Sequence, residues 1–132
     1  MFFFGAHSWR GASGRRYRFK CVLTKQGLPP QGVGGIYIFV RRSHNAWREI
    51  VCVANMSPVV RQWRVGVPGG GWWAEILNTD AAEFGGSNVV NAPLKAEHKS
   101  WDGQPASVVI TLPPLGVCWL APIDEPKKKP VD

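Results

Sequence analysis

Four carboxylates stand among turn-forming residues in the second half of the sequence: Glu75, Asp80, Glu83 and Asp102. A pair of carboxylates on either side of a glycosidic bond can hydrolyse it, one acting as acid and the other as base or nucleophile. Such a pair needs a walled cleft that shifts its pKa values. A chain of 132 residues has little material to build one around turns. We therefore expect no catalytic residue among the four.

A structural role fits the stretch WWAEILNTDAAEFGGSNVVN better. Asn78 and Asp80 are of the types that bond nearby backbone amides in Asx turns. Asp80 and Glu83 have the three-residue spacing of a capping box, so we expect them to cap a helical turn. Gly85 and Gly86 permit backbone angles that other residues avoid. These five residues are predicted to hold a turn and a cap.

Tryptophans are the better candidates for binding. Trp72 and Trp73 are adjacent, and successive side chains of a strand point to opposite faces, so one should enter the core and the other the surface. An exposed indole can stack on a ligand or pack against a neighbouring domain. Core filling, domain packing and stacking all remain open for these two residues. Trp101 is a third candidate contact of the same kind.

The elements that must position these residues are short strands. The 15 Gly and 11 Pro are spread along the chain and disfavour long helices. Alternating or β-branched runs predict an all-β fold. Residues 81–105 form a long irregular connection, and the tail at 123–132 is expected to be disordered. The predicted strands cover 17–23, 36–42, 47–54, 63–67, 72–77, 107–112 and 117–121.

The cysteines and the hydropathy of the sequence indicate the cellular environment expected for the chain. Cys21, Cys52 and Cys118 each lie inside an apolar run, which favours small buried thiols in a reducing cytoplasm over disulfides. No two Cys or His residues have metal-ligand spacing, so we expect no metal and no cofactor. No run of about 18 apolar residues exists, so no membrane span is expected, and MFFFGAHSW is too short for a secretory signal.

Basic charge is concentrated in the first fifty residues, which carry nine Arg or Lys and a single acidic residue. The remainder is nearly neutral. Clustered basic and aromatic side chains are typical of single-strand nucleic-acid binders, although a solvated basic face is the more common meaning of such a charge. The interleaved residues are Arg15, Arg16, Tyr17, Arg18, Tyr37, Arg41 and Arg42.

A family resemblance lies in ordered anchors between residues 50 and 122: VANMSPV, WRVGVP, EILNTD, FGGSNVVN and WDGQPASVVITLPPLGV. Together they resemble the C-terminal all-β domain of bacterial 1,4-α-glucan branching enzymes, in the α-amylase family. The resemblance implies an antiparallel β-sandwich that packs on a catalytic barrel. It also implies that branching chemistry belongs to the barrel, whose catalytic residues have no matching motif here. Trp72, Trp73 and Trp101 then become candidate contacts to α-glucan or to the barrel.

The first 49 residues depart from that family pattern, although FVRRS is compatible with its opening strand. Residues 15–50 instead resemble the start of a GIY-YIG nuclease-type domain, through Gly35, Ile36 and Tyr37. The second half of that motif is missing, because the next strand reads IVCVAN. We therefore expect a basic N-terminal segment at 1–49, a branching-enzyme-like β-domain at 50–122 and a tail at 123–132. We expect the chain to be a truncated or fused fragment. The alternative to a branching-enzyme-like function is nucleic-acid binding through the basic N-terminal segment.

Overall fold

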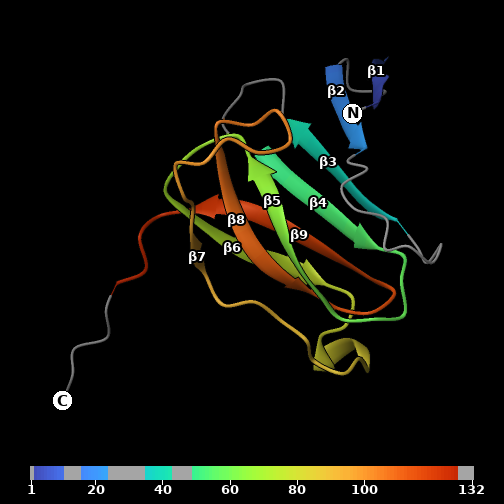
Figure 1. Ribbon diagram of the computed structural model, residues 1–132, viewed down its shortest axis with the longest axis vertical. Helices are drawn as coiled ribbons and strands as arrows, with labels where there is room; N and C mark the ends of the chain where they lie inside the picture. The colour runs from blue at the N-terminus through green and yellow to red at the C-terminus, as the bar shows by residue number, and fades with distance from the viewer. Residues whose placement is uncertain (1, 11–15, 24–34, 43–48, 128–132) are drawn as a thin grey trace.

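The computed structural model describes residues 2–10, 16–23, 35–42 and 49–127 (Figure 1). They form nine strands and one short 3-10 helix, η1 (Ala82–Phe84), so the predicted all-β class is confirmed. The strands are β1 (Phe2–Arg10), β2 (Arg16–Leu23), β3 (Ile36–Arg42), β4 (Glu49–Asn55), β5 (Arg61–Val67), β6 (Trp72–Asn78), β7 (Leu94–Lys95), β8 (Ala106–Leu112) and β9 (Gly116–Ile123).

Each predicted strand appears within about two residues of its expected bounds, except where Trp47 and Arg48 lie outside the described residues. Two strands were not expected. β1 contains Gly5 and Ser8, which break its hydrophobic alternation. β7 has only two residues, too few for any period. Ile123, the first residue of the expected disordered tail, ends β9; residues 124–127 have no regular secondary structure, and residues 128–132 lie outside the described residues, so the disorder of the tail stays a prediction.

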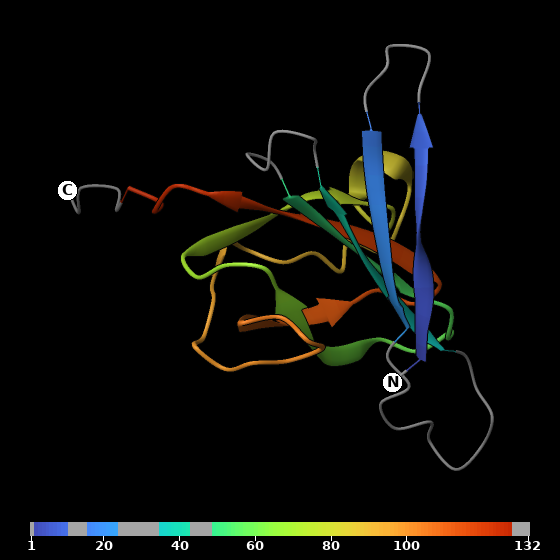
Figure 2. The same cartoon turned by 90° about the horizontal axis from the view of Figure 1, so that it is seen from above.

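Two antiparallel sheets make up the fold. The larger sheet has the order β1-β2-β3-β4-β9-β6-β7, and the smaller sheet pairs β5 with β8. Figure 2 shows the smaller sheet lying against one face of the larger sheet. Pairing in the larger sheet runs across residue 49, because β3 pairs with β4 from Ile36↔Asn55 to Arg42↔Glu49. The basic segment before residue 49 therefore contributes β1, β2 and β3 to the same sheet as β4, β6, β7 and β9.

The core fills the space between the two sheets with aliphatic side chains and one indole. Alternate residues of each strand point inward, as the two-residue period of a strand requires. The larger sheet contributes Ile36, Ile38, Val40, Val51, Val53, Trp73, Cys118 and Leu120. The smaller sheet contributes Val65, Val67, Ala106, Val108, Ile110 and Leu112.

Two of the three cysteines have described side chains, and both are buried free thiols, as predicted. Burial raises the pKa of Cys52 to about 11 and that of Cys118 to about 12. Both thiols are therefore protonated at neutral pH and are poor nucleophiles. Cys21 lies in β2, where no side chain is described. Within the described chain, no helix is long and apolar enough to cross a membrane.

Trp73 supplies the first testable prediction. Its side chain is 2% exposed, and its Nε1 donates a hydrogen bond to the Gly69 carbonyl at 3.1 Å. Trp73→Ala should lower the free energy of unfolding by about 3–5 kcal/mol, because it opens a cavity in the core. Trp72→Ala, on the opposite face, should cost less than half as much. Urea-induced unfolding of the two variants measures both values, and equal losses would contradict the assignment of faces.

Candidate functional site

The first candidate surface lies on the face of the larger sheet that is turned away from the core. Phe39, Cys52, Trp119 and Leu77 are cross-strand neighbours, so their side chains form one row across four strands. A second row joins Tyr37, Ala54 and Val117, and Trp72 lies farther along β6. We call these eight residues the outer apolar face.

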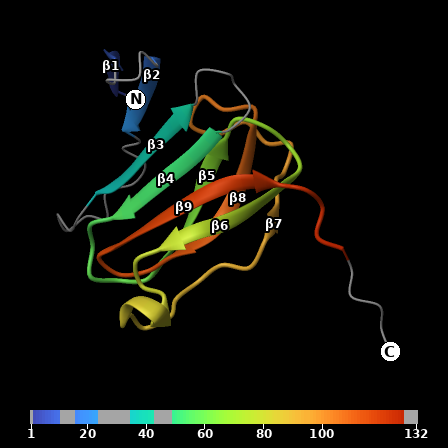
Figure 3. The ribbon, with the colours of Figure 1, turned by 180° about the vertical axis from the view of Figure 1, so that it is seen from behind.

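Both faces of the central strands are apolar, and this distinguishes the larger sheet. Every residue from Val51 to Ala54 on β4 is buried, although only Val51 and Val53 belong to the core between the sheets. Antiparallel strands with one solvated face usually alternate apolar and polar residues, whereas continuous apolar runs mark strands covered on both sides. Figure 3 looks onto the outer apolar face, and no described element lies over it. The face therefore has the composition of an interface.

The smaller sheet has the opposite pattern. The outward residues that alternate with its core residues are mostly polar: Gln62 and Arg64 on β5, with Ser107, Val109 and Thr111 on β8. This polar alternation is typical of a sheet that faces water. The smaller sheet thus presents the solvent side of the sandwich.

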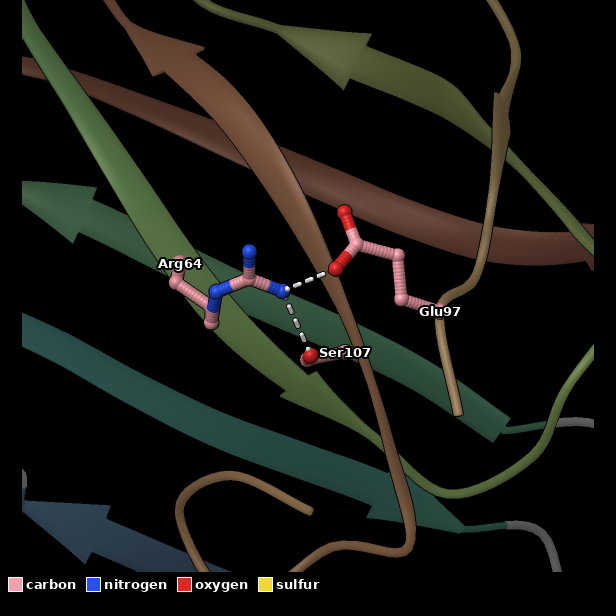
Figure 4. Close-up of polar contacts among 3 residues, drawn as sticks. All are labelled: Arg64, Glu97 and Ser107. Atoms are coloured by element: carbon pink, nitrogen blue, oxygen red, sulfur yellow. Dashed lines mark hydrogen bonds and ion pairs between the residues drawn. The ribbon is translucent and has the colours of Figure 1, made fainter. Parts of the chain in front are cut away.

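A polar cluster with an indole at its centre covers part of this solvent side. Arg64 Nη1 donates hydrogen bonds of 2.9 Å to Glu97 Oε2 and to Ser107 Oγ (Figure 4). Arg64 Cζ lies 5.9 Å from the centroid of the Trp101 ring, and Lys99 Nζ lies 5.5 Å from it. These distances are within the range of cation–π attraction. We call these five residues the Trp101 cluster.

The long connection at 81–105 brings the Trp101 cluster together. Glu97 exchanges backbone hydrogen bonds with Ser107, which ties the connection to β8. The chain then passes over β5 so closely that a Cβ on Gly66 would lie 2.1 Å from the Trp101 carbonyl oxygen. Sequence reasoning identified Trp101 but missed Arg64 and Glu97, because 33 positions separate them and only the fold makes them neighbours.

Of the three candidate tryptophans, Trp73 is a core residue and has no surface for an external contact. Trp72 and Trp101 are partly exposed: Trp72 lies on β6 of the larger sheet, and Trp101 lies in the connection that crosses the smaller sheet.

The loop after β6 is held by side chains that bond across it. Asn78 Oδ1 accepts the Asp80 amide at 2.8 Å, and Asn78 Nδ2 donates to the Val89 carbonyl at 2.8 Å. Asp80 accepts the amides of Ser87 and Val89, both at 3.0 Å. Asp80 therefore joins the two limbs of the loop.

The predicted capping box does not form. The N-cap of η1 is Ala81, without a side-chain cap bond, and Asn88 Oδ1 accepts the Ala82 amide at 3.1 Å instead. The carboxylate of Asp80 is not free for capping, because the far limb of the loop uses it. Glu83 is exposed and takes no part in the cap.

Glycine is required at two positions of this loop, for a different structural reason at each. Gly85 ends η1 in the left-handed conformation, with φ of 78°, a region that costs a side chain energy. At Gly86 a Cβ would lie 2.1 Å from the Asp80 carbonyl oxygen, so close packing of the two limbs requires glycine.

The four carboxylates do not converge on one site. Glu75 Oε2 accepts a 2.8 Å hydrogen bond from Asn91 Nδ2, and Asn91 in turn bonds the backbone of Thr111 on β8. Asp102 is half-buried near the Gly66 amide, and this burial raises its pKa. In the part of the chain that the structure describes, no three His, Cys, Asp or Glu side chains gather as metal ligands would.

The hydrogen bonds to the Asp80 carboxylate allow us to predict how acid changes the stability of the folded domain. Hydrogen bonds from the Val89 and Ser87 amides hold the pKa of its carboxyl below the ordinary value of 3.8. A lowered folded pKa adds stability above the unfolded pKa, and this stability is lost as the pH falls through the folded pKa. Asp80→Asn should therefore melt below the wild type at neutral pH, and the gap should narrow below about pH 4.

Thermal unfolding followed by circular dichroism across this pH range measures the gap. Asp124→Asn, in the exposed segment after β9, is the control and should show no such narrowing. A gap between wild type and Asp80→Asn that stays constant in acid would contradict the role assigned to the carboxylate.

Comparison with known proteins adds the family. A family model described as the alpha amylase C-terminal all-beta domain matches residues 32–123. The 1,4-alpha-glucan branching enzyme of Myxococcus xanthus is 48% identical over 96 residues, which cover 71% of this chain and 13% of that enzyme. The same-named enzyme of Rubrobacter xylanophilus is 48% identical over 116 residues, covering 80% of this chain and 16% of that enzyme. The chain thus spans less than a fifth of these relatives.

The matched range bears on whether residues 15–50 derive from a GIY-YIG domain. It includes Gly35 and the first two residues of β3, Ile36 and Tyr37, which pair with β4, so the comparisons do not support a GIY-YIG origin. They give no support to nucleic-acid binding either. The division at residues 49 and 122 stays a prediction, although the match begins at residue 32. The sandwich, the anchors between residues 50 and 122 and the family match agree: the chain belongs to the alpha amylase C-terminal all-beta domain family.

Proposed function

We propose that this chain is the non-catalytic β-domain of a cytoplasmic 1,4-α-glucan branching enzyme and packs on the catalytic domain of that enzyme. The observation that carries the proposal is the outer apolar face, which has the composition of a covered surface. The names of the similar enzymes supply the identity of the partner. The two buried free thiols support the cytoplasmic setting, where disulfides are rare.

The absence of catalysis follows from how the carboxylates are used. Asp80 holds the two limbs of its loop, and Glu75 bonds Asn91 at the edge between the sheets. Both carboxylates are thus engaged by groups of the domain itself, whereas glycoside chemistry requires a pair of carboxylates that flank the substrate. Branching of α-glucan therefore depends on the catalytic domain.

Docking follows from the energetics of apolar burial. Covering apolar surface contributes roughly 25 cal/mol per Å². Trp72 and Trp119 offer the largest side chains on the outer apolar face, and aromatic residues are enriched where interfaces are most tightly packed. We expect these two indoles to be the central contacts with the catalytic domain.

The first test asks whether the chain is inactive by itself. The purified chain is incubated with amylose, and α-1,6 branches are counted after enzymatic debranching. We expect no branches above a blank, with the complete Myxococcus xanthus enzyme as positive control. Robust branching by the chain alone would contradict the proposal that branching depends on the catalytic domain.

The second test locates the docking face with two matched substitutions. Tyr37 on the outer apolar face is 39% exposed, and Val109 on the smaller sheet is 38% exposed. Tyr37→Asp should weaken binding to a Myxococcus xanthus enzyme truncated before its matching β-domain, because docking would bury the new charge. Val109→Asp should bind as the wild type does. Calorimetric titration measures both affinities, and the reverse ranking would move the interface to the smaller sheet.

A further inference from the structure

We infer that the Trp101 cluster is a binding site for an α-glucan chain, on the side of the sandwich opposite the docking face. The choice of α-glucan rests on the proposed function. The site itself rests on the geometry of the solvent side, where an indole is surrounded by groups that can donate or accept hydrogen bonds.

The backbone holds Trp101 rigidly. Its amide donates to the Gln104 carbonyl at 3.0 Å, and the Gln104 amide donates back to the Trp101 carbonyl at 2.8 Å. The same peptide lies directly on Gly66, where no side chain fits. A backbone held in this way loses little entropy when a ligand binds, which is one advantage of a preorganised site.

The polar groups beside the indole have unused capacity for hydrogen bonds. Arg64 is held by two bonds from Nη1, and none of its described hydrogen bonds uses Nε or Nη2. Glu97 is engaged through Oε2, which leaves Oε1 as an acceptor, and its side chain is 56% exposed. Lys99 is exposed and adds a flexible donor. Two donors, Arg64 and Lys99, therefore lie over the indole ring, and the Glu97 acceptor lies beside Arg64.

A neutral sugar fits this mixture better than an anion. The apolar face of a pyranose can stack on an indole while its hydroxyls, each both donor and acceptor, bond the charged groups that surround the ring. A phosphate or nucleic acid would meet a single uncompensated positive charge in the cluster, that of Lys99, because Glu97 is paired with Arg64 at 2.9 Å. The cluster thus favours a polyhydroxylated ligand without charge.

The two faces of the sandwich allow docking and glucan binding at once. The outer apolar face belongs to the larger sheet, and the Trp101 cluster is bonded to Ser107 on the smaller sheet. Figure 2 shows the two sheets packed against each other. A domain fixed to the catalytic domain on one side could hold a glucan chain on the other. This tethering raises the local concentration of substrate near the enzyme.

Affinity electrophoresis of the full chain in native gels containing amylopectin tests the site. We expect amylopectin to retard the wild type, and Trp101→Ala to weaken the apparent affinity about tenfold because the stacking surface is lost. Trp72→Ala is the matched control and should be retarded as the wild type is. Glu97→Ala removes an exposed acceptor and should weaken affinity several-fold, with a melting temperature close to that of the wild type.

The outcomes separate this site from the docking proposal. Absence of retardation of the wild type overturns the site, as does equal retardation of a folded Trp101→Ala. Retardation lost in Trp72→Ala but kept in Trp101→Ala would place the glucan on the other sheet and also overturn it. If Trp101→Ala has a lower melting temperature than the wild type, Glu97→Ala becomes the deciding variant. Retardation of Glu97→Ala equal to that of the wild type would then overturn the site. Binding to the truncated enzyme, measured on the same samples, tests docking independently.

Discussion

The constraint that governs this molecule is that its larger sheet is apolar on both faces. The smaller sheet covers one face, and Val51 and Val53 pack into the resulting core. The other face carries Cys52 and Trp119, cross-strand neighbours with no described layer above them. A sheet of this composition is stable and soluble most readily when a second surface covers it. The location of the interface follows from this asymmetry between the two sheets.

Polar side chains decide how the sheets are joined at their ends. Asn55 is fully buried, and its Nδ2 donates to the carbonyls of Val59 and Pro113, both at 2.9 Å. Its Oδ1 accepts the Ser57 amide at 3.0 Å, so the buried amide side chain is satisfied and links the turn after β4 to the turn after β8. Asp80 does similar work in the loop after β6. Glu75 and Asp80, which first suggest catalysis, therefore have structural roles, because each has hydrogen-bond partners inside the domain.

Strands and turns were predictable because their causes are local. The run SVVITL and the segment PGGG show their structure through β-branched residues and through glycine and proline. The capping role of Asp80 was wrong because Ser87 and Val89 compete for the same carboxylate from the far limb of the loop. Local spacing cannot reveal such competition. The short strand β7 was missed for a similar reason, since only its pairing with Trp72 and Trp73 makes it a strand.

The sequence by itself determined the all-β class, the opposite directions of Trp72 and Trp73, the burial of Cys52 and Cys118, and the family anchors. These follow from periodicity and residue type over a few positions. Only the tertiary structure decided which indole is core, which sheet has an outer apolar face with no described element over it, and that Arg64, Glu97 and Trp101 meet. Those facts depend on strand pairing and on the path of a long connection. Contacts between residues distant in sequence arise from packing, and no local pattern encodes them.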